Sequence, residues 1–346
     1  MTLEDAFRHQ AISCRALGSP FMGQLFDMLA EHWPGDSALG QRFAQFTGDV
    51  GPSGASLPLR IAGGLHALVL SQQDQGLQAV YPPHDTSDVD LRRAVLAAFE
   101  THEDFLLDWV ESPPQTNEVR RSAALMPAAA VVAQRFPTPV WLSELGASGG
   151  LNLNWDHFAL ALPGARLGPE EAVLTLTPDW RGPLPPLHLP RIAARGGVDL
   201  NPLDPTAPDD LLRLTAFLWP DQPQRLALTR AAASVATTKP DPGDAINWLE
   251  ARLAAAPKGH THLIQHTVAW QYFPKDAQNR GQALIEAAGA RATDDTPLGW
   301  AAMETDGDTK GSVGAALTLR LWPGDVTFFL GRADFHGRWI EWEGVA

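Results

Sequence analysis

Residues 139–151 read PVWLSELGASGGL, and this stretch decides the fold of the chain. It opens with an apolar run that continues through Glu144 to Leu145 and ends at a glycine-rich turn, residues 146–150. A Leu/Asn-rich segment able to begin a helix follows. An apolar run bounded by glycines is typical of a buried parallel strand. We therefore expect a strand, a tight turn and a helix, the first half of a βαβ unit, whose turn N–H groups face a polar or anionic ligand.

The turn is compatible with two chemistries. Aligned on Glu144, it reads acid-x-Gly-x-Ser-x-Gly, which resembles the first motif of class I S-adenosylmethionine-dependent methyltransferases, with Ser148 in place of the usual middle glycine. Aligned on Ser148, it is G-x-S-x-G, the nucleophile elbow of α/β-hydrolases. It is a poor dinucleotide fingerprint, because G-x-G-x-x-G requires glycine at position 148. A purely structural turn without a ligand is the third interpretation.

Composition restricts the class of protein. The chain has 346 residues, 45% of them apolar, and a net charge of −14. Nucleic acid and anionic membranes are disfavoured as partners, because both attract a basic face. Cys14 is the only cysteine, so an internal disulfide and a cysteine-based zinc site are excluded and a reducing cytoplasm is expected. The polar N-terminus predicts no signal peptide, no window is long enough to span a membrane, and no metal-ligand set is visible.

The hydrophobic pattern predicts a helical N-terminal region, residues 1–135, and a Rossmann-like domain, residues 136–346. Helical spacing of apolar residues predicts helices within 1–46, 59–70, 87–110 and 119–134. After the glycine turn, strands are expected at 192–200, 261–268, 298–304, 315–322 and 326–330, and helices at 209–219, 222–237, 243–256 and 276–288. The proline-rich residues 163–190 are expected to form an inserted hairpin and loop. This alternation predicts an α/β fold.

Longer segments resemble a bacterial family. They are TNEVRRSAAL (116–125), ELGASGGLNL (144–153), RGGVDLNPLDP (195–205), WPDQPQRL (219–226) and HTVAWQYFP (266–274). Together they resemble an uncharacterised bacterial family, domain of unknown function 2332, over nearly the whole chain. The glycine turn, a downstream acid and the strand order also resemble class I methyltransferases, whose sheet is Rossmann-like with the last strand inserted antiparallel.

The methyltransferase resemblance implies a cofactor site for S-adenosylmethionine. Its methionine portion would lie against Gly146, Ala147, Ser148 and Gly150, and Glu144 would orient the turn or the cofactor ammonium. An acid after the second strand would accept hydrogen bonds from the ribose hydroxyls.

Asp199 is the natural ribose acceptor in this scheme. The interval from the glycine turn is longer than the roughly twenty residues of the dinucleotide analogue, and the proline-rich insertion would account for the difference. Asp156 and Asp204 remain alternatives.

Catalytic candidates are His266, Tyr272, Glu118 and Arg120. His266, with Gln265, Trp270 and Tyr272, could contact adenine or substrate, and its alternative is a satisfied buried histidine. Glu118 could reach over the cofactor or simply stand at a helix start. Arg120 and Arg121 could bind a substrate carboxylate or phosphate, or form ordinary salt bridges.

The hydrolase alternative requires Ser148 as nucleophile, Asp306 or Asp308 as acid and His336 as base, in the order serine, acid, histidine. No HGGG-type oxyanion motif precedes Ser148, Glu144 would charge the strand before the elbow, and the preceding region is helical. A non-catalytic protein that binds a nucleoside-like ligand, or acts through partners, is the third class. The sequence favours methyl transfer to a small molecule, with the helical region as a substrate lid; it leaves the acceptor and the oligomeric state open.

Overall fold

The computed structural model describes residues 1–52, 54–307 and 313–345. The chain divides into two compact units. The helical unit consists of Met1–Thr116 with Pro208–Ala227, and the sheet unit consists of Asn117–Ala207 with Leu228–Ala346. This division differs from a single boundary near residue 135, because helix α8 (Ser122–Arg135) packs on the sheet and helix α9 (Pro208–Ala216) packs on a helix of the first unit.

The helical unit begins with α1 (Leu3–Ala16), α2 (Pro20–His32), α3 (Ala38–Ala44), α4 (Leu57–Leu70), α5 (Gln75–Val80), α6 (Asp88–Thr101) and α7 (Glu103–Trp109). Serine side chains cap several helix starts; those of Ser19, Ser37 and Ser87 each accept an N–H three residues on. The helices predicted within 1–46 and 59–70 are confirmed, and α5 was not predicted.

The predicted helix 87–110 is two helices. The chain leaves the helical conformation at His102, where φ is −118° and ψ is 30°. The His102 ring contacts the Asp74 carboxylate at 3.1 Å. This partner lies outside the local sequence, so the apolar periodicity of residues 87–110 gave no sign of the break.

The sheet unit contains a nine-stranded sheet in the order β5-β12-β11-β10-β9-β8-β1-β6-β7. Its strands are β1 (Val140–Leu145), β5 (Asp179–Arg181), β6 (Ile192–Asp199), β7 (Asp241–Pro242), β8 (Thr261–Thr267), β9 (Leu298–Glu304), β10 (Ala315–Trp322), β11 (Val326–Ala333) and β12 (Trp339–Trp342). From β7 through β6, β1 and β8 to β9, all neighbours are parallel. Strands β9 to β12 are successively antiparallel, and β5 pairs parallel with β12. The predicted α/β class is confirmed.

One expectation about the sheet is wrong. The resemblance implied that the last strand would be inserted antiparallel between earlier ones, but β9, β10, β11 and β12 are neighbours in chain order. The tight turn at 323–325 joins β10 directly to β11, which leaves no gap for a later strand. The strands from the C-terminal part of the chain, β9 to β12, therefore form an antiparallel meander.

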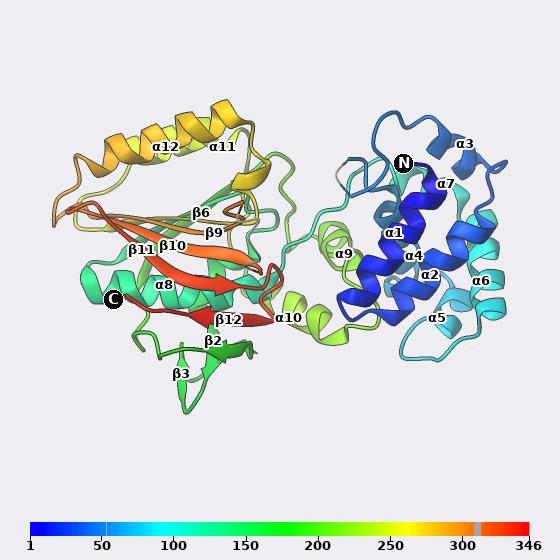
Figure 1. Cartoon of the computed structure of the whole chain (residues 1–346), viewed down its shortest axis with the longest axis horizontal. Helices are drawn as coiled ribbons and strands as arrows, with labels where there is room; N and C mark the ends of the chain where they lie inside the picture. Colours follow the sequence, from blue (N-terminus) through cyan, green and yellow to red (C-terminus); the bar gives the residue numbers. More distant parts are fainter. Residues whose placement is uncertain (53, 308–312, 346) are drawn as a thin grey trace. The chain divides into compact units, whose positions relative to one another are not determined.

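Helices cover both faces of the sheet, with α8 on one side and α11 (Ala245–Ala254) and α12 (Lys275–Gly289) on the other (Figure 1). Buried side chains of β1, β6, β8 and both latter helices form one apolar cluster that includes Leu145, Val198, Leu249, Ile264 and Ile285. Each such side chain contributes about 1.5–3 kcal/mol on burial. In the described part of the chain, no helix is long and apolar enough to cross a membrane.

The segment after the glycine turn differs from the predicted helix. It is a 3₁₀ segment, η2 (Leu151–His157), which is interrupted at Asn154 (φ −108°, ψ 18°). No α-helix therefore begins at this turn, and the expected helix dipole is not part of the site. The chain continues into a small sheet of β2 (Phe158–Leu162), β3 (Ala165–Leu167) and β4 (Leu174–Leu176). The hairpin expected within residues 163–190 differs from this arrangement, because the antiparallel pair is β2 with β3 and begins before residue 163, whereas β4 pairs parallel with β2.

Candidate functional site

The glycine turn lies at the topological switch point of the sheet. Strand β1 has β6 on one side and β8 on the other, both parallel to it, and Glu144 near its end pairs with Gly197 and Gln265. The chain leaves β1 for β6 on one side and reaches β8 later on the other. Open α/β sheets bind ligands outside the carboxyl ends of such strands. The turn 146–150 therefore occupies the edge at which a ligand site is expected.

The backbone of this turn is tightly held. The Gly150 N–H donates to Ala147 O (2.7 Å), and the Ala147 N–H donates to Val198 O of β6 (3.0 Å). The φ angles of Gly146, Ser148 and Gly150 are 68°, 53° and 69°. Glycine adopts these angles freely, whereas a side chain in the left-handed region costs about 1–2 kcal/mol. Ser148 thus sits where the backbone favours glycine, the residue usual in the motif that it resembles.

Replacing Ser148 by glycine is expected to relieve this strain. We predict that Ser148→Gly is more stable than Ser148→Ala by about 1 kcal/mol, although glycine normally lowers stability relative to alanine. The comparison removes the hydroxyl in both variants and leaves the φ preference as the difference. Urea unfolding of both proteins measures it. A more stable alanine variant would contradict the strain.

Gly146 is required by packing within the protein. A Cβ atom placed on Gly146 would lie 2.5 Å from the Ala269 Cβ, far inside contact distance. Ala269 belongs to the loop after β8, so the space beside Gly146 is filled by that loop. The lack of a side chain at Gly146 therefore allows the loops after β1 and β8 to pack against each other, and Gly146→Val would disturb both loops. A loss of ligand binding in this variant would not show that the ligand approaches Gly146.

Asp199 contacts the glycine turn directly. Its Oδ2 accepts the Ser148 N–H at 2.8 Å and its Oδ1 accepts the Asn201 N–H at 3.0 Å. The other two acids considered for a ribose have different partners. Asp156 holds Arg195 through both oxygens, at 2.8 and 2.9 Å, and Asp204 accepts from the Thr206 N–H and hydroxyl. Asp199 is the acid that the sheet brings to the turn.

Glu144 and Ser148 present buried polar atoms at the same place. Glu144 is 2% exposed and Ser148 is 6% exposed. Within the described residues, Glu144 Oε2 and Ser148 Oγ have no hydrogen-bond partner. Burial raises the pKa of Glu144 to about 8, against the opposing effects of a Gln265 hydrogen bond and the Arg121 charge. Unpaired buried oxygens of this kind are costly unless a ligand, water or proton satisfies them.

A layer of amides joins the turn to the segment before α8. Asn117 Oδ1 accepts the Leu151 N–H (2.8 Å), and the Asn152 amide donates to Glu118 O (3.3 Å). Gln265 donates to Asn152 O (3.2 Å) and accepts from Trp155 Nε1 (3.0 Å). The sequence suggested that Glu118 could reach over the cofactor, but it did not identify Asn152 and Trp155. Their roles depend on contacts between segments that are distant in sequence.

His266 is satisfied within the protein. Its Nδ1 lies 2.8 Å from Glu304 Oε1, and its Nε2 accepts the Trp300 indole N–H at 2.9 Å. This pattern corresponds to a neutral ring protonated at Nδ1. Trp270 stacks on the ring at a centroid distance of 5.0 Å. The geometry favours the interpretation of His266 as a satisfied buried histidine over contact with adenine or substrate.

Glu304 holds the loop that follows β8. Its Oε1 accepts the N–H groups of Ala269 (2.9 Å) and Trp270 (3.1 Å), and its Oε2 accepts that of Gln271 (3.3 Å). Burial raises the pKa of this carboxyl, but the His266 hydrogen bond and the backbone donors outweigh it and leave the pKa below the ordinary value. Sequence reasoning missed Glu304. Its signal was an acid at the end of the predicted strand 298–304.

The remaining catalytic candidates differ in accessibility. Tyr272, at the end of η3 (Trp270–Tyr272), is 74% exposed, so its ring is available to a ligand. Glu118 precedes η1 (Val119–Arg121) and is 4% exposed. Both of its carboxylate oxygens accept from the Arg120 guanidinium, at 3.0 and 3.2 Å. The Glu118–Arg120 pair therefore fits the salt-bridge interpretation.

Among the residues that the structure describes, those of the hydrolase alternative do not form a hydrogen-bonded triad with Ser148. The Ser148 hydroxyl has no hydrogen-bonding histidine among the residues that the structure describes. Asp306 forms an ion pair with Arg332, the His336 N–H donates to Asp334, and Asp308 lies outside the described residues.

A different serine–histidine pair is buried between β1 and β8. Ser143 Oγ and His262 Nε2 are 2.8 Å apart, and the two residues are 0% and 3% exposed. Arg252 Nε also donates to this hydroxyl, at 3.1 Å. Because the pair is inaccessible and the guanidinium occupies the serine oxygen, it is structural.

The family described as "uncharacterized protein conserved in bacteria (DUF2332)" matches residues 4–342. The chain belongs to this family. The suspected family is thus confirmed, and its description carries no activity. No curated protein and no solved structure matches the chain.

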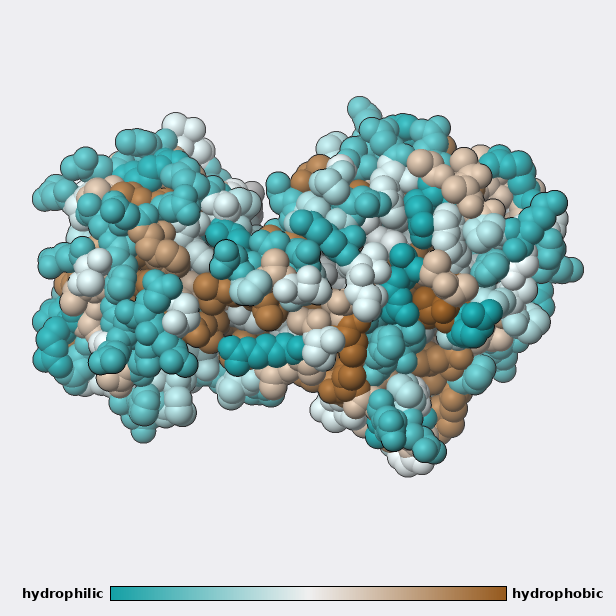
Figure 2. Space-filling view, turned by 180° about the vertical axis from the view of Figure 1, so that it is seen from behind, coloured by the Kyte–Doolittle hydropathy of each residue, from teal (hydrophilic) through white to brown (hydrophobic). Residues whose placement is uncertain are grey.

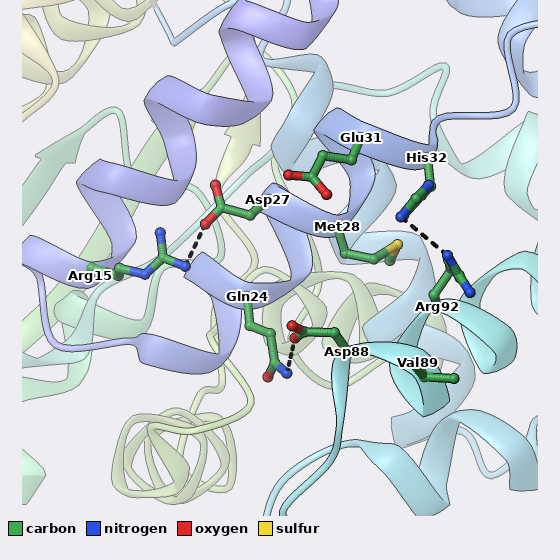
Figure 3. Close-up of a pocket in the computed structure, with 9 residues that line it drawn as sticks. All are labelled: Arg15, Gln24, Asp27, Met28, Glu31, His32, Asp88, Val89 and Arg92. Carbon is green, nitrogen blue, oxygen red and sulfur yellow. Dashed lines mark hydrogen bonds and ion pairs between the residues drawn. The ribbon is translucent and has the colours of Figure 1, made fainter.

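The DUF2332 chain also has hollows away from the switch point. One, of about 300 Å³, lies between α1, α2 and α6 of the helical unit (Figure 3). Three polar pairs line it: Arg15 with Asp27, Gln24 with Asp88 and Arg92 with His32, at 2.6, 2.8 and 3.4 Å. A second, of about 440 Å³, is lined by α8, by residues 183–186 and by residues 342–345 of the sheet unit.

Hydrophobic residues reach the surface of the sheet unit above its small projecting sheet (Figure 2).

Neither hollow contains a buried unpaired polar atom among the described residues. Nor does any group of three or more His, Cys, Asp and Glu side chains in the described part form a metal site. The switch point differs from both hollows, because convergent polar groups there lie beside two buried atoms without partners among the described residues, Glu144 Oε2 and Ser148 Oγ.

Proposed function

We propose that this chain binds S-adenosylmethionine at the carboxyl edge of β1, β6 and β8 and transfers its methyl group to a small molecule. The observation that supports this most is the contact between Asp199 and the Ser148 N–H. It brings an acid after the second parallel strand to the glycine turn after the first, at a switch point. An acceptor for ribose hydroxyls is required at that position.

The polar groups at the turn suit such a ligand. Each Asp199 oxygen accepts one backbone N–H and keeps a further lone pair for a hydroxyl. Glu144 Oε2, near the end of β1, and Ser148 Oγ, on the turn, are two of the buried atoms without partners in the described chain, and both lie where the methionine portion would bind. One misfit is Gly146, whose open side is taken by Ala269. The ligand would therefore approach from the side of Ser148.

Methyl transfer requires little chemistry from the protein. The sulfonium of the bound cofactor supplies the electrophilic methyl group, so the protein's task is to position an in-line attack and exclude water. The satisfied His266 ring is consistent with this, because no strong base is needed. Tyr272, exposed at the same edge, is the residue available to contact the acceptor.

Calorimetric titration with S-adenosylmethionine and S-adenosylhomocysteine tests the proposal. We expect binding near micromolar strength, about −8 kcal/mol. Asp199→Asn removes the charge and should weaken binding about 100-fold, because hydrogen bonds to a charged acceptor contribute about 1.5–3 kcal/mol each. Asp204→Asn, in a nearby turn, is the matched control and should bind like the wild type. A folded protein that gives no heat with either compound would refute the proposal.

A serine hydrolase is the second candidate, favoured by the positive φ of Ser148 in a turn directly after a strand. Labelling by a fluorophosphonate probe that is lost in Ser148→Ala would support it. An unlabelled wild-type protein would exclude it.

A further inference from the structure

The Glu144 carboxyl is enclosed at the end of β1, one residue before Leu145 and two before the turn. It is 2% exposed, and its Oε2 has no partner among the described residues. A buried carboxylate with an empty oxygen is unstable, because desolvation costs more than one remaining hydrogen bond returns. The carboxyl must therefore hold a proton or be given a cation.

The groups facing Glu144 do not supply that cation. From β8, the Gln265 amide donates a hydrogen bond to Glu144, but the same amide also donates to Asn152 O. From η1, Arg121 favours the charged form at a distance, while its guanidinium donates to Phe335 O (2.9 Å) and Thr267 O (3.3 Å). From β6, Asp199 opposes ionisation. No salt bridge to Glu144 is formed within the described chain.

We infer that a ligand bound at the glycine turn places a cationic group against Glu144, and that its binding drives a proton from this carboxyl into solvent. This inference rests on the proposed function, since S-adenosylmethionine carries two cations, an ammonium and a sulfonium. The balance is simple: the neutral carboxyl becomes a carboxylate paired with the ligand cation, and the buffer takes up one proton. The raised pKa of Glu144, about 8, agrees with a protonated carboxyl before binding.

Calorimetry in buffers of different ionisation enthalpy counts the protons released. A carboxyl with a pKa of about 8 is about nine-tenths protonated at pH 7. The wild type should therefore release about 0.9 proton more per S-adenosylmethionine than Glu144→Gln, which keeps the shape but has no proton to lose. The difference between the proton counts of the wild type and Glu144→Gln excludes any proton taken up by the ligand's own ammonium. Glu171→Gln, an exposed acid of the same unit, should match the wild type.

The homocysteine product separates the two cations. S-adenosylhomocysteine retains the ammonium and lacks the sulfonium. An excess proton released with both ligands assigns the ammonium to Glu144, and an excess with S-adenosylmethionine alone assigns the sulfonium. Either result supports the coupling.

Two outcomes overturn the inference and can be told apart. Equal proton counts for the wild type and Glu144→Gln, with tight binding, refute the coupling and leave the proposed function standing. No binding of either ligand refutes both the coupling and the proposed function.

A separate measurement needs no ligand. From pH 6 to 9 the unfolding free energy of the wild type should fall relative to that of Glu144→Gln, because the pKa of Glu144 is higher in the folded than in the unfolded protein. Parallel curves would show that Glu144 is already ionised, against the inference.

Discussion

Acidification from pH 7 to pH 4 is expected to lower the stability of the sheet unit by about 3 kcal/mol through His262 alone. Burial, and secondarily the nearby Arg252 charge, lowers the pKa of His262 from 6.5 to about 3. The folded pKa lies below the unfolded one, so the unfolded chain binds the extra proton. The contribution of neutral His262 to the unfolding free energy is therefore fully present above pH 6.5 and is lost progressively as the pH falls toward 3.

Several contacts enforce the neutral ring. His262 Nε2 meets Ser143 Oγ, whose other partner is Arg252, and the Trp141 ring lies 4.9 Å from the imidazole. The guanidinium lies over Trp141 at 3.6 Å, which fixes a positive charge beside the histidine. A protonated imidazole would be buried beside the positive charge of Arg252.

Urea unfolding followed by tryptophan fluorescence, repeated from pH 7 to pH 4, measures the effect. His262→Gln should cost about 1–2 kcal/mol at pH 7 from the altered packing and hydrogen bond. It should then lose less stability than the wild type as the pH falls. His188→Gln, an exposed histidine of the same unit, controls for the substitution. Equal slopes for His262→Gln and the wild type would show that His262 does not titrate in this way.

The second large effect is expected from Glu304→Ala, with a loss of about 3–5 kcal/mol. Glu304 accepts from His266 and from the backbone N–H groups of Ala269, Trp270 and Gln271. Removing the carboxylate leaves these partly buried donors without an acceptor, and each costs about 1–3 kcal/mol when unsatisfied. Part of this loss is recovered as the loop relaxes.

Glu304→Gln and Glu343→Ala complete the test. The glutamine keeps one acceptor oxygen and should lose less than the alanine variant, and Glu343 is an exposed acid whose removal should cost under about 0.5 kcal/mol. Because Ala269 fills the space beside Gly146, Glu304→Ala should also weaken ligand binding at the turn. A loss of stability below 1 kcal/mol would mean that the loop is held by other contacts.

The sequence predicted elements whose pattern is local. The apolar runs of β1, β8 and β9, and the amphipathic helices α11 and α12, lie close to their predicted bounds. It failed for elements that depend on distant partners. The four residues of β12 exist as a strand because they pair with β11 and β5, and η2 stops short of an α-helix, with its first N–H bound by Asn117. No local pattern contains these contacts.

The candidate site divides in the same way. The turn 146–150 and the acid Asp199 were predictable, since each follows a recognisable strand and the order of parallel strands brings them together. The role of His266 was not predictable, because its protonation pattern depends on Glu304 and Trp300 across the neighbouring strand. The sequence left open whether His266 contacts adenine or substrate or is a satisfied buried histidine, and the hydrogen-bond partners favour the second interpretation.

The two units are interleaved along the chain, and this affects how the protein is made. The helical unit needs α9, whose following residue Phe217 packs against Gly63 of α4. During synthesis, α9 leaves the ribosome only after β1 and β6, so the first unit must wait, incomplete, while the second begins to form. A protein cut after Thr116 would lack this helix and expose the apolar surface of α4. Joining residues 1–116 directly to 208–227 is the shortest chain expected to fold as the helical unit alone.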